Sequence, residues 1–256
     1  MSLINATIPG ALDELLGELD ALGQQGAHIK LLLDGALHAK MLRHVAQSGW
    51  AWLSVFTQSQ QGGSRALLSA SPLVLHCPAD ERQRLVKLLL ECEGLPMASF
   101  WVGQETLPSR TERFLPWCIV KADDLTVNLR YPDTRRLPEI VRILDVEQRG
   151  ALFGDDTLCL YQARDGSWQR LAREAAPQPV AEAVKLDARQ TLALLRDAEA
   201  DEILHALTYK SAFPPASAWL RHQSVQRALQ ALDQQGIQAA PERQTACEQA
   251  LKLLKI

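Results

Sequence analysis

The chain has 256 residues, of which 47% are hydrophobic and 22% charged, an ordinary globular composition. Its formal net charge of -3 and isoelectric point near 6.1 argue against a general nucleic-acid binder, which would carry a basic surplus. A chain of this length buries a large core and accommodates one large domain or two small ones.

The cysteines also narrow the class of protein. They are widely spaced, odd in number and form no Cys-x-x-Cys pair, which favours reduced thiols over a disulfide framework. The N-terminus shows no basic region followed by an apolar run, so we expect no signal peptide. No apolar stretch reaches the roughly 18 residues that a membrane span needs. We therefore expect a cytoplasmic protein with neither membrane nor nucleic acid among its partners.

Helix and strand signals alternate along the first half of the chain. Leucines at helical spacing predict a helix over residues 8–23, with Pro9 in its first turn and Gly23 at its exit. Residues 58–64 are predicted to form a flexible loop. The other expected elements are strands at 28–34, 50–56, 73–77 and 98–102, helices at 37–48 and 79–93, and a loop with a short helix at 103–115.

Two hairpins are predicted in the middle of the chain, with two short helices between them. Pro138 fits the first turn of the first of these helices, which runs to residue 144. Asp145 and Gln148 then have the spacing of a capping box for a second short helix, which ends at Gly154. The predicted hairpins pair 117–121 with 125–131 around residues 122–124, and 157–163 with 167–171 around residues 164–166.

The composition changes at residues 172–186, which we interpret as a linker. Everything beyond it predicts helix, with Asp187 and Gln190 capping the first one. We therefore predict a mixed α/β fold class, with an N-terminal α/β lobe built on a small mixed sheet and a C-terminal helical lobe. The predicted units are residues 1–171, the linker 172–186 and the helical lobe 187–256; the helices of that lobe are expected over 187–207, 216–232 and 241–255.

Sequence motifs for catalysis are absent. The chain contains no Gly-x-Ser-x-Gly elbow, Walker loop, dinucleotide fingerprint or His-Glu-x-x-His. The histidines are scattered, so we expect no metal and no cofactor. Paired carboxylates occur at Asp123-Asp124 and Asp155-Asp156, between predicted elements, where turn aspartates are common. We interpret them as turn residues rather than acid–base pairs, and assign no catalytic residue.

The most distinctive stretch is Leu129–Leu137, which reads Leu-Arg-Tyr-Pro-Asp-Thr-Arg-Arg-Leu where strand should give way to helix. Asp133 is well placed to cap the helix that follows. An arginine held beside a carboxylate by forked hydrogen bonds would lock strand to helix, and Asp34, at the end of an earlier strand, is another candidate partner. We interpret the stretch as a structural polar clamp in preference to an anion-binding site.

These residues carry a resemblance to a known family. The chain resembles the adaptor-chaperones of the bacterial type VI secretion system. Leu32–Ala36 stands where the family has its Leu/Ile-Asp-Gly-Ala motif, and Trp50–Phe56 and Ser71–Val74 are similar to its next two segments. Leu129–Leu137 is similar to the family's motif of an arginine and aromatics, then Asp-Pro-Arg and a leucine. The order and spacing of these motifs over about residues 29–171 carry the resemblance.

The chain departs from the family pattern in two places. Pro132 stands where the family has a second aromatic residue, and Thr134 where it has proline. Asp133 and Arg135 keep their spacing nonetheless.

The resemblance implies a non-enzymatic protein. Such adaptors bind a cognate toxic effector, keep it stable and help load it onto the VgrG spike, so the expected partners are an effector and VgrG. The family offers no catalytic residues to transfer. Its motif residues here are expected to hold the domain together or to line an effector groove: Asp34, Arg130, Tyr131, Asp133 and Arg135.

The tryptophans Trp50, Trp52 and Trp101 are candidate partner-binding residues, because tryptophan is over-represented in binding hot spots. Core packing is the alternative for all three. The alternative function is a hydrolase or transferase with an unmarked site near Asp34, Arg130 and Asp133. A third hypothesis is an interaction module of the same fold outside secretion.

Overall fold

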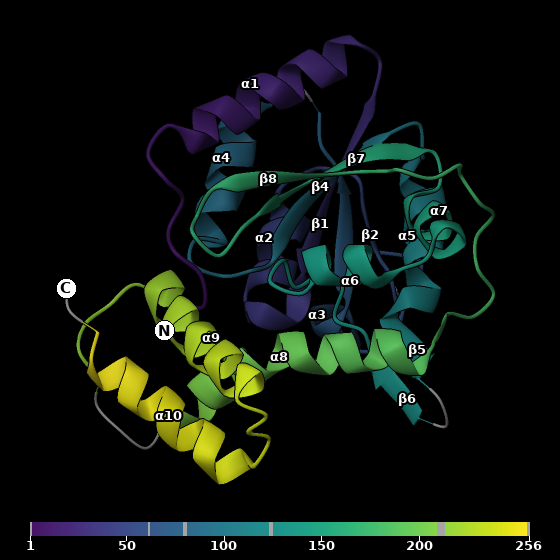
Figure 1. Ribbon diagram of the computed structural model, residues 1–256. Helices are drawn as coiled ribbons and strands as arrows, with labels where there is room; N and C mark the ends of the chain where they lie inside the picture. The colour runs from purple at the N-terminus through teal and green to yellow at the C-terminus, as the bar shows by residue number, and fades with distance from the viewer. Residues whose placement is uncertain (1, 61, 79–80, 123–124, 209–212, 255–256) are drawn as a thin grey trace.

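The computed structural model describes residues 2–60, 62–78, 81–122, 125–208 and 213–254. Figure 1 shows a layered α/β body, with the last helices gathered at one side. The strands are β1 His28–Asp34, β2 Trp52–Ser54, β3 Pro72–His76, β4 Ala98–Gly103, β5 Ile119–Ala122, β6 Leu125–Asn128, β7 Asp156–Gln162, β8 Trp168–Ala172 and β9 Lys185–Leu186. The helices are α1 Ala11–Gln24, η1 Gly35–Leu37, α2 Met41–Gln47, α3 Arg65–Ala70, α4 Arg82–Glu91, α5 Leu107–Cys118, α6 Leu137–Ile143, α7 Val146–Phe153, α8 Ala188–Thr208, α9 Ala218–Gln234 and α10 Ala240–Lys252.

The strands form a larger and a smaller sheet. The larger has the order β2-β3-β1-β4-β7-β8, and each neighbouring pair in it runs antiparallel. The smaller has the order β6-β5-β9 and is mixed, because β5 pairs antiparallel with β6 and parallel with β9. The predicted α/β class is confirmed, and the mixed pairing belongs to the smaller sheet.

Alternation along β1 explains the layers. Leu31 and Leu33 point to one face of the larger sheet, where they join a core with α1, α2 and α4. Leu32 points to the other face, where it joins a core with α5, α6, α7 and the smaller sheet. Both faces are therefore buried, which fits the continuous apolar run that predicted this strand.

Helix α8 contributes side chains to two hydrophobic cores. Its Leu194 packs against the core of the α/β body, whereas Ala200 and Leu207 contribute to a core shared with α9 and α10. The segment predicted as a linker ends in β9, whose Leu186 is buried against the body. The domain boundaries stay predictions. No helix in the described part of the chain is long and apolar enough to span a bilayer.

The capping predictions for the helices that follow Asp145 and Asp187 are confirmed. Asp145 and Gln148 form a reciprocal capping box at the start of α7. Asp187 and Gln190 make the same pair of hydrogen bonds at the start of α8. Gly154 ends α7 with φ 55, and a Cβ there would collide with the side chains of Arg113 and Glu105.

Some predicted elements differ from the structure. Trp117 was expected to begin a strand, but α5 runs on to Cys118 because Phe114 and Trp117 pack into the core at helical spacing. Pro116 lies inside α5 and has no N–H, so the helix runs without the bond that residue 116 would otherwise donate to the carbonyl of Glu112. Helix α3, capped by Ser64, was not predicted. Asp123 and Asp124 lie outside the described residues.

Candidate functional site

Arg130 turns the chain sharply between β6 and α6. It adopts the left-handed backbone conformation, with φ 52, and its N–H donates to Asn128 Oδ1 at 3.1 Å. This turn brings Arg130 Nη2 within 2.7 Å of Asp34 Oδ2 at the end of β1. The predicted arginine–Asp34 contact is therefore confirmed, and it joins segments 96 positions apart.

Asp34 is buried, and each of its carboxylate oxygens accepts a hydrogen bond. Its Oδ1 accepts a hydrogen bond from the Ala36 N–H at 3.1 Å, which starts the η1 turn. Burial raises the pKa of Asp34 above its ordinary value, although the charge of Arg130 and its hydrogen bond act in the opposite direction. The contact with Arg130 therefore compensates only part of the desolvation of this carboxylate.

Asp133 and Arg135 form a fork of the kind expected in this stretch, between residues two positions apart. Arg135 Nε and Nη2 donate to the two carboxylate oxygens of Asp133 at 3.0 and 2.7 Å. The expectation that Asp133 caps the next helix is wrong. Its side chain accepts the Arg135 N–H at 3.0 Å instead, because α6 begins only at Leu137, beyond the reach of this carboxylate.

Tyr131 is fully buried beneath this turn. Its ring stacks on Phe114 with centroids 5.0 Å apart, and its hydroxyl lies 3.7 Å from Cys118 Sγ. Burial raises the pKa of Tyr131 well above its usual value. In this position the residue anchors the Leu129–Leu137 stretch to α5.

The arginines that follow Asp133 reach across to α8. Arg136 Nη1 and Nη2 lie 2.8 Å from carboxylate oxygens of Asp197 and Asp201, respectively. Arg164, in the β7–β8 turn, donates to both oxygens of Asp201 at 3.0 and 2.7 Å. Arg135 approaches the same carboxylate at 3.5 Å. We call this set the ionic latch: Arg135, Arg136, Arg164, Asp197 and Asp201.

The latch sets the charge state of its central carboxylate. Burial alone would raise the pKa of Asp201, but the hydrogen bonds and charge of Arg164 and the charges of Arg135 and Arg136 outweigh it and lower the pKa to about 2. Asp201 is therefore ionised throughout the physiological range. The pKa of Asp197 is raised instead, because burial outweighs its contact with Arg136.

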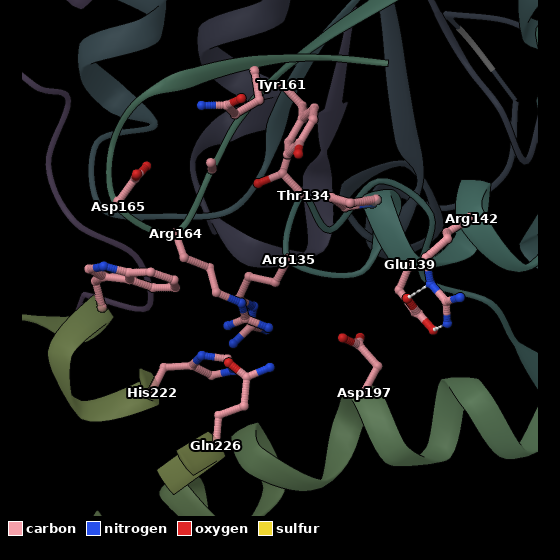
Figure 2. A pocket seen from close by; sticks show the side chains of 14 residues that line it. Thr134, Arg135, Glu139, Arg142, Tyr161, Arg164, Asp165, Asp197, His222 and Gln226 are labelled. Atoms are coloured by element: carbon pink, nitrogen blue, oxygen red, sulfur yellow. Dashed lines mark hydrogen bonds and ion pairs between the residues drawn. The ribbon is translucent and has the colours of Figure 1, made fainter. Parts of the chain in front are cut away.

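A pocket of about 420 Å³ opens beside the latch, and we call it the junction pocket. Figure 2 shows side chains from α6, the β7–β8 hairpin, α8 and α9 converging on it. It is lined by Thr134, Arg135, Pro138, Glu139, Arg142, Tyr161, Ala163, Arg164, Asp165, Gln169, Asp197, Trp219, His222 and Gln226. A second pocket, of about 520 Å³, shares Arg135 and is also lined by Asp201, so cavities flank the latch.

His222 stands over the latch from α9. It is 7% exposed, and its ring stacks on Trp219 at an interplanar angle of 12°. Burial and the charge of Arg164 lower the pKa of His222 to about 4, with smaller contributions from Arg135 and Arg136 and an opposing one from Asp201. The imidazole is therefore neutral at pH 7.

The predicted partner-binding tryptophans lie in the core. Trp50, Trp52 and Trp101 are 5%, 7% and 0% exposed. Trp101 packs edge-on against Phe114, and its ring also receives the guanidinium of Arg110 at 5.0 Å. Burial on this scale favours core packing, the alternative considered above, over contact with a partner.

A second buried ionic cluster was missed by sequence reasoning. Asp156 was expected in a turn, but it is fully buried at the start of β7 and lies 2.6 Å from Lys30 Nζ and 2.7 Å from Arg110 Nη2. Arg113 pairs with Glu105 at 2.8 Å beside it. Two arginines one helical turn apart, on the face of α5 that carries Phe114, were the available signal.

The histidines form no metal site in the described ranges. The rings of His38 and His44 lie 5.8 Å apart. However, no group of three or more His, Cys, Asp or Glu side chains in that part of the chain is arranged to hold a metal ion.

The fold and the site define a mixed α/β protein whose strand-to-helix clamp is joined by ion pairs to a C-terminal helical unit. Residues 31–151 match the family model described as "Domain of unknown function (DUF4123)", a family known as a domain associated with type VI secretion effectors. No curated protein matches the chain, and no solved structure matches it. The matched residues include Asp34 and all of Leu129–Leu137, whereas α8, α9 and α10 lie outside them.

Proposed function

We propose that the chain is a non-enzymatic adaptor that binds a cognate type VI secretion effector, keeps it stable and loads it onto the VgrG spike. One observation carries this proposal: the family match over residues 31–151 contains both halves of the clamp, Asp34 with Arg130 and Asp133 with Arg135.

The geometry of the clamp supports a structural use of the motif. Asp34 and Asp133 each accept hydrogen bonds from an arginine and from a backbone N–H. These bonds hold the end of β1, the Arg130 turn and the approach to α6 in one arrangement. The adaptor reading therefore assigns the motif to the scaffold and leaves effector contacts to the surfaces around it.

The test is a pull-down of the full chain from cells that co-express it with each protein encoded beside it. We expect one toxic effector to co-purify and to be stable only when the two are expressed together. The captured complex should then bind VgrG. The same binding measurement on the chain without effector is the control. A folded, monodisperse chain that binds none of its neighbours would overturn the proposal.

A hydrolase or transferase near Asp34, Arg130 and Asp133 makes a different prediction. Asp133→Asn would then abolish turnover of a substrate while the protein remained folded. The adaptor predicts no turnover to lose. It predicts a loss of stability instead, because the fork between two opposite charges becomes a weaker contact between the Arg135 guanidinium and a neutral amide.

A further inference from the structure

Strand β8 forms one outer edge of the larger sheet, beyond β7. Just before β8, the Ala163 N–H donates to the Ser167 carbonyl. Just after it, the Arg173 N–H donates to the Thr157 carbonyl. Because hydrogen-bonded and non-hydrogen-bonded pairs alternate in an antiparallel ladder, the N–H and C=O groups of every second β8 residue point away from β7. The residues whose backbone groups point outwards are Trp168, Arg170 and Ala172.

These outward backbone groups have no partner in the ranges that the structure describes. None of them takes part in a hydrogen bond with another segment of those ranges. Gln169, Arg170 and Ala172 are exposed, and in Figure 1 β8 crosses the front of the sheet with no helix or strand drawn over it. The edge is therefore open to solvent, and its donors and acceptors can be reached from outside.

The other sheet edges in the described part of the chain are shorter or occupied. At β2, the outward Ser54 N–H donates to the Ser59 carbonyl at 3.2 Å. Strand β9 has two residues, and its Lys185 carbonyl accepts a hydrogen bond from Gln148 Nε2 at 2.8 Å. Strand β6 is open, but the described residues that point outwards from it are two: Thr126 and Asn128. The β8 edge is therefore the longest one left unpaired.

The β8 edge also lacks the usual protection of an exposed strand. Native proteins blunt such edges with proline, lysine, bulges or covering elements, because an open row of N–H and C=O groups pairs with other chains. The β8 sequence contains neither proline nor lysine, and its register with β7 is unbroken. Arg170 is drawn to the α1 face, where its Nη2 lies 2.8 Å from Glu18 Oε2. An unprotected edge of this kind indicates a place where a further strand binds.

Apolar side chains border the edge on both faces of the sheet. Trp168 packs toward α1 and α4, with its ring centroid 5.6 Å from that of Phe100. A pocket of about 210 Å³ beside Trp168 is lined in part by Ile8 and Leu12. Leu171 packs on the opposite face, against the core that contains α5, α6 and α7. Because Trp168 and Leu171 are only partly buried, an added strand gains apolar contacts on either side.

We propose that an extended, apolar segment of the effector adds to the larger sheet beside β8. Its backbone pairs with the outward N–H and C=O groups of Arg170 and Ala172, and its side chains alternate between the Trp168 face and the Leu171 face. In this mode of recognition, main-chain hydrogen bonds supply affinity and the flanking side chains supply specificity. The inference rests on the proposed adaptor function and deepens it, because it names the surface and the way in which the effector is held.

Amide hydrogen exchange resolved by residue tests the pairing on the full chain, alone and in complex with the effector that the pull-down identifies. We expect exchange at the Arg170 and Ala172 amides to slow at least about tenfold in the complex, because these donors become hydrogen-bonded. The Leu171 amide is the internal control, since it already points to β7 and should change little. A helix or loop that merely covered β8 would not slow alternate residues in this way.

Ala172→Pro supplies the second measurement. It removes an outward N–H and places the proline ring in the path of an added strand, but it leaves the bonds to β7 intact, as an edge strand tolerates. Affinity for the effector should fall at least about tenfold, while urea unfolding stays close to that of wild type. Thr126→Pro is the matched control, because it makes the same change on the open edge of β6 and should leave affinity unchanged.

The outcomes separate this inference from the proposed function. Alternate protection along β8 with weakened binding by Ala172→Pro supports both. An effector that binds wild type but leaves the Arg170 and Ala172 amides unprotected, or binds folded Ala172→Pro unchanged, overturns the β8 assignment and leaves the adaptor function standing. The exchange measurement decides the question alone if Ala172→Pro does not fold.

The same measurements identify any other occupant of the edge. Protection of the Arg170 and Ala172 amides that rises with the concentration of the chain alone would mean that a second copy covers β8, and would overturn the effector strand. A wild-type chain that captures no effector overturns the adaptor function, and this inference falls with it.

Discussion

Arg130 and Asp34 form an ion pair across 2.7 Å that ties the end of β1 to the turn between β6 and α6. The arginine reaches this position only by adopting φ 52, a backbone conformation that residues with a side chain rarely occupy. The protein thus accepts local strain at one residue in order to neutralise a carboxylate buried at the end of a central strand.

Substitution of Arg130 can separate the strain from the ion pair. Arg130→Ala should lower the free energy of unfolding by about 1–2 kcal/mol, a value discounted because the guanidinium is partly exposed. Arg130→Gly loses the same ion pair but relieves the backbone, so it should be about 1 kcal/mol more stable than Arg130→Ala. Urea unfolding of both variants checks this, with Arg196→Ala on the exposed side of α8 as control. Equal stabilities would show that the left-handed turn carries no strain.

The ionic latch predicts an acid-sensitive contribution of Asp201. Its folded pKa of about 2 lies below the unfolded value near 3.9, so its stabilisation is present above pH 4 and is lost as the pH falls toward 2. Asp201→Asn should therefore lower the free energy of unfolding by about 2.5 kcal/mol at pH 7. This difference from wild type should stay constant down to about pH 5 and shrink below pH 4. Exposed Glu112→Gln is the control, and a difference that does not change with pH would contradict the prediction.

Protonation of His222 is expected to change the folding stability in a separate pH range, above that of Asp201. Its folded pKa of about 4 lies below the unfolded value near 6.5, so the protein should lose stability as the pH falls from 6.5 toward 4. This loss approaches about 3 kcal/mol at the lower end. His222→Gln should remove this component, so that the variant gains on wild type as the pH falls. Chemical unfolding at pH 7, 5.5 and 4.5 measures the effect, and the exposed, non-titrating Gln230→Ala on the same helix should leave the wild-type profile unchanged.

Substitution of Asp156 is expected to cause the largest single loss of folding stability. It neutralises Lys30 and Arg110, which are both buried, so Asp156→Asn leaves uncompensated positive charge in the core. We expect a loss of about 3–5 kcal/mol, measured by thermal and urea unfolding. The neighbouring exposed residue offers a matched control, since Asp155→Asn should change stability by less than about 0.5 kcal/mol. A mild effect at Asp156 would mean that the Lys30 ammonium sheds its proton, in the direction in which burial lowers its pKa.

The caps of α7 and α8 predict an energetic coupling. Gln190 Nε2 donates to Gln148 Oε1 at 2.6 Å, so the third residues of two capping boxes bind each other. Each change to alanine should cost about 1–2 kcal/mol. The double variant should cost less than the sum by about 1 kcal/mol, because the contact can be lost only once. Strictly additive losses in a double-mutant cycle would show that the two caps act independently.

Short-range signals predicted much of this fold. The bounds of β1 match the predicted strand, and Asp145, Gln148, Asp187 and Gln190 cap helices as their spacing indicates. Each of these features depends on residues within a few positions of one another. Backbone propensity and local hydrogen bonds are therefore enough to define them.

The candidate site was predictable only in part. A forked arginine–carboxylate contact was expected in this stretch, with Asp34 as one candidate partner, because charged groups concentrated at a strand end need partners. The structure pairs Arg130 with Asp34 and forms the fork between Arg135 and Asp133. The partner-binding role of Trp50, Trp52 and Trp101 remains a prediction, and their burial weighs against it. The sequence alone left this role open because it does not show which face of an element meets the core. The role of Asp156 was missed for the same reason.

The sequence by itself determined the α/β class and the caps of α7 and α8, because these arise from periodicity and from neighbours in the chain. The sequence offered Arg130 and Asp34 as candidate partners, but only the fold brings these residues, 96 positions apart, into contact. Only the tertiary structure decided that Arg136 and Arg164 bind α8, and that Thr134 and His222 share a pocket. Those groups are separated by tens of residues, and they meet because burial of Leu194 and Ala200 in different cores lays α8 across the clamp. Long-range burial therefore determined where the latch and the junction pocket lie.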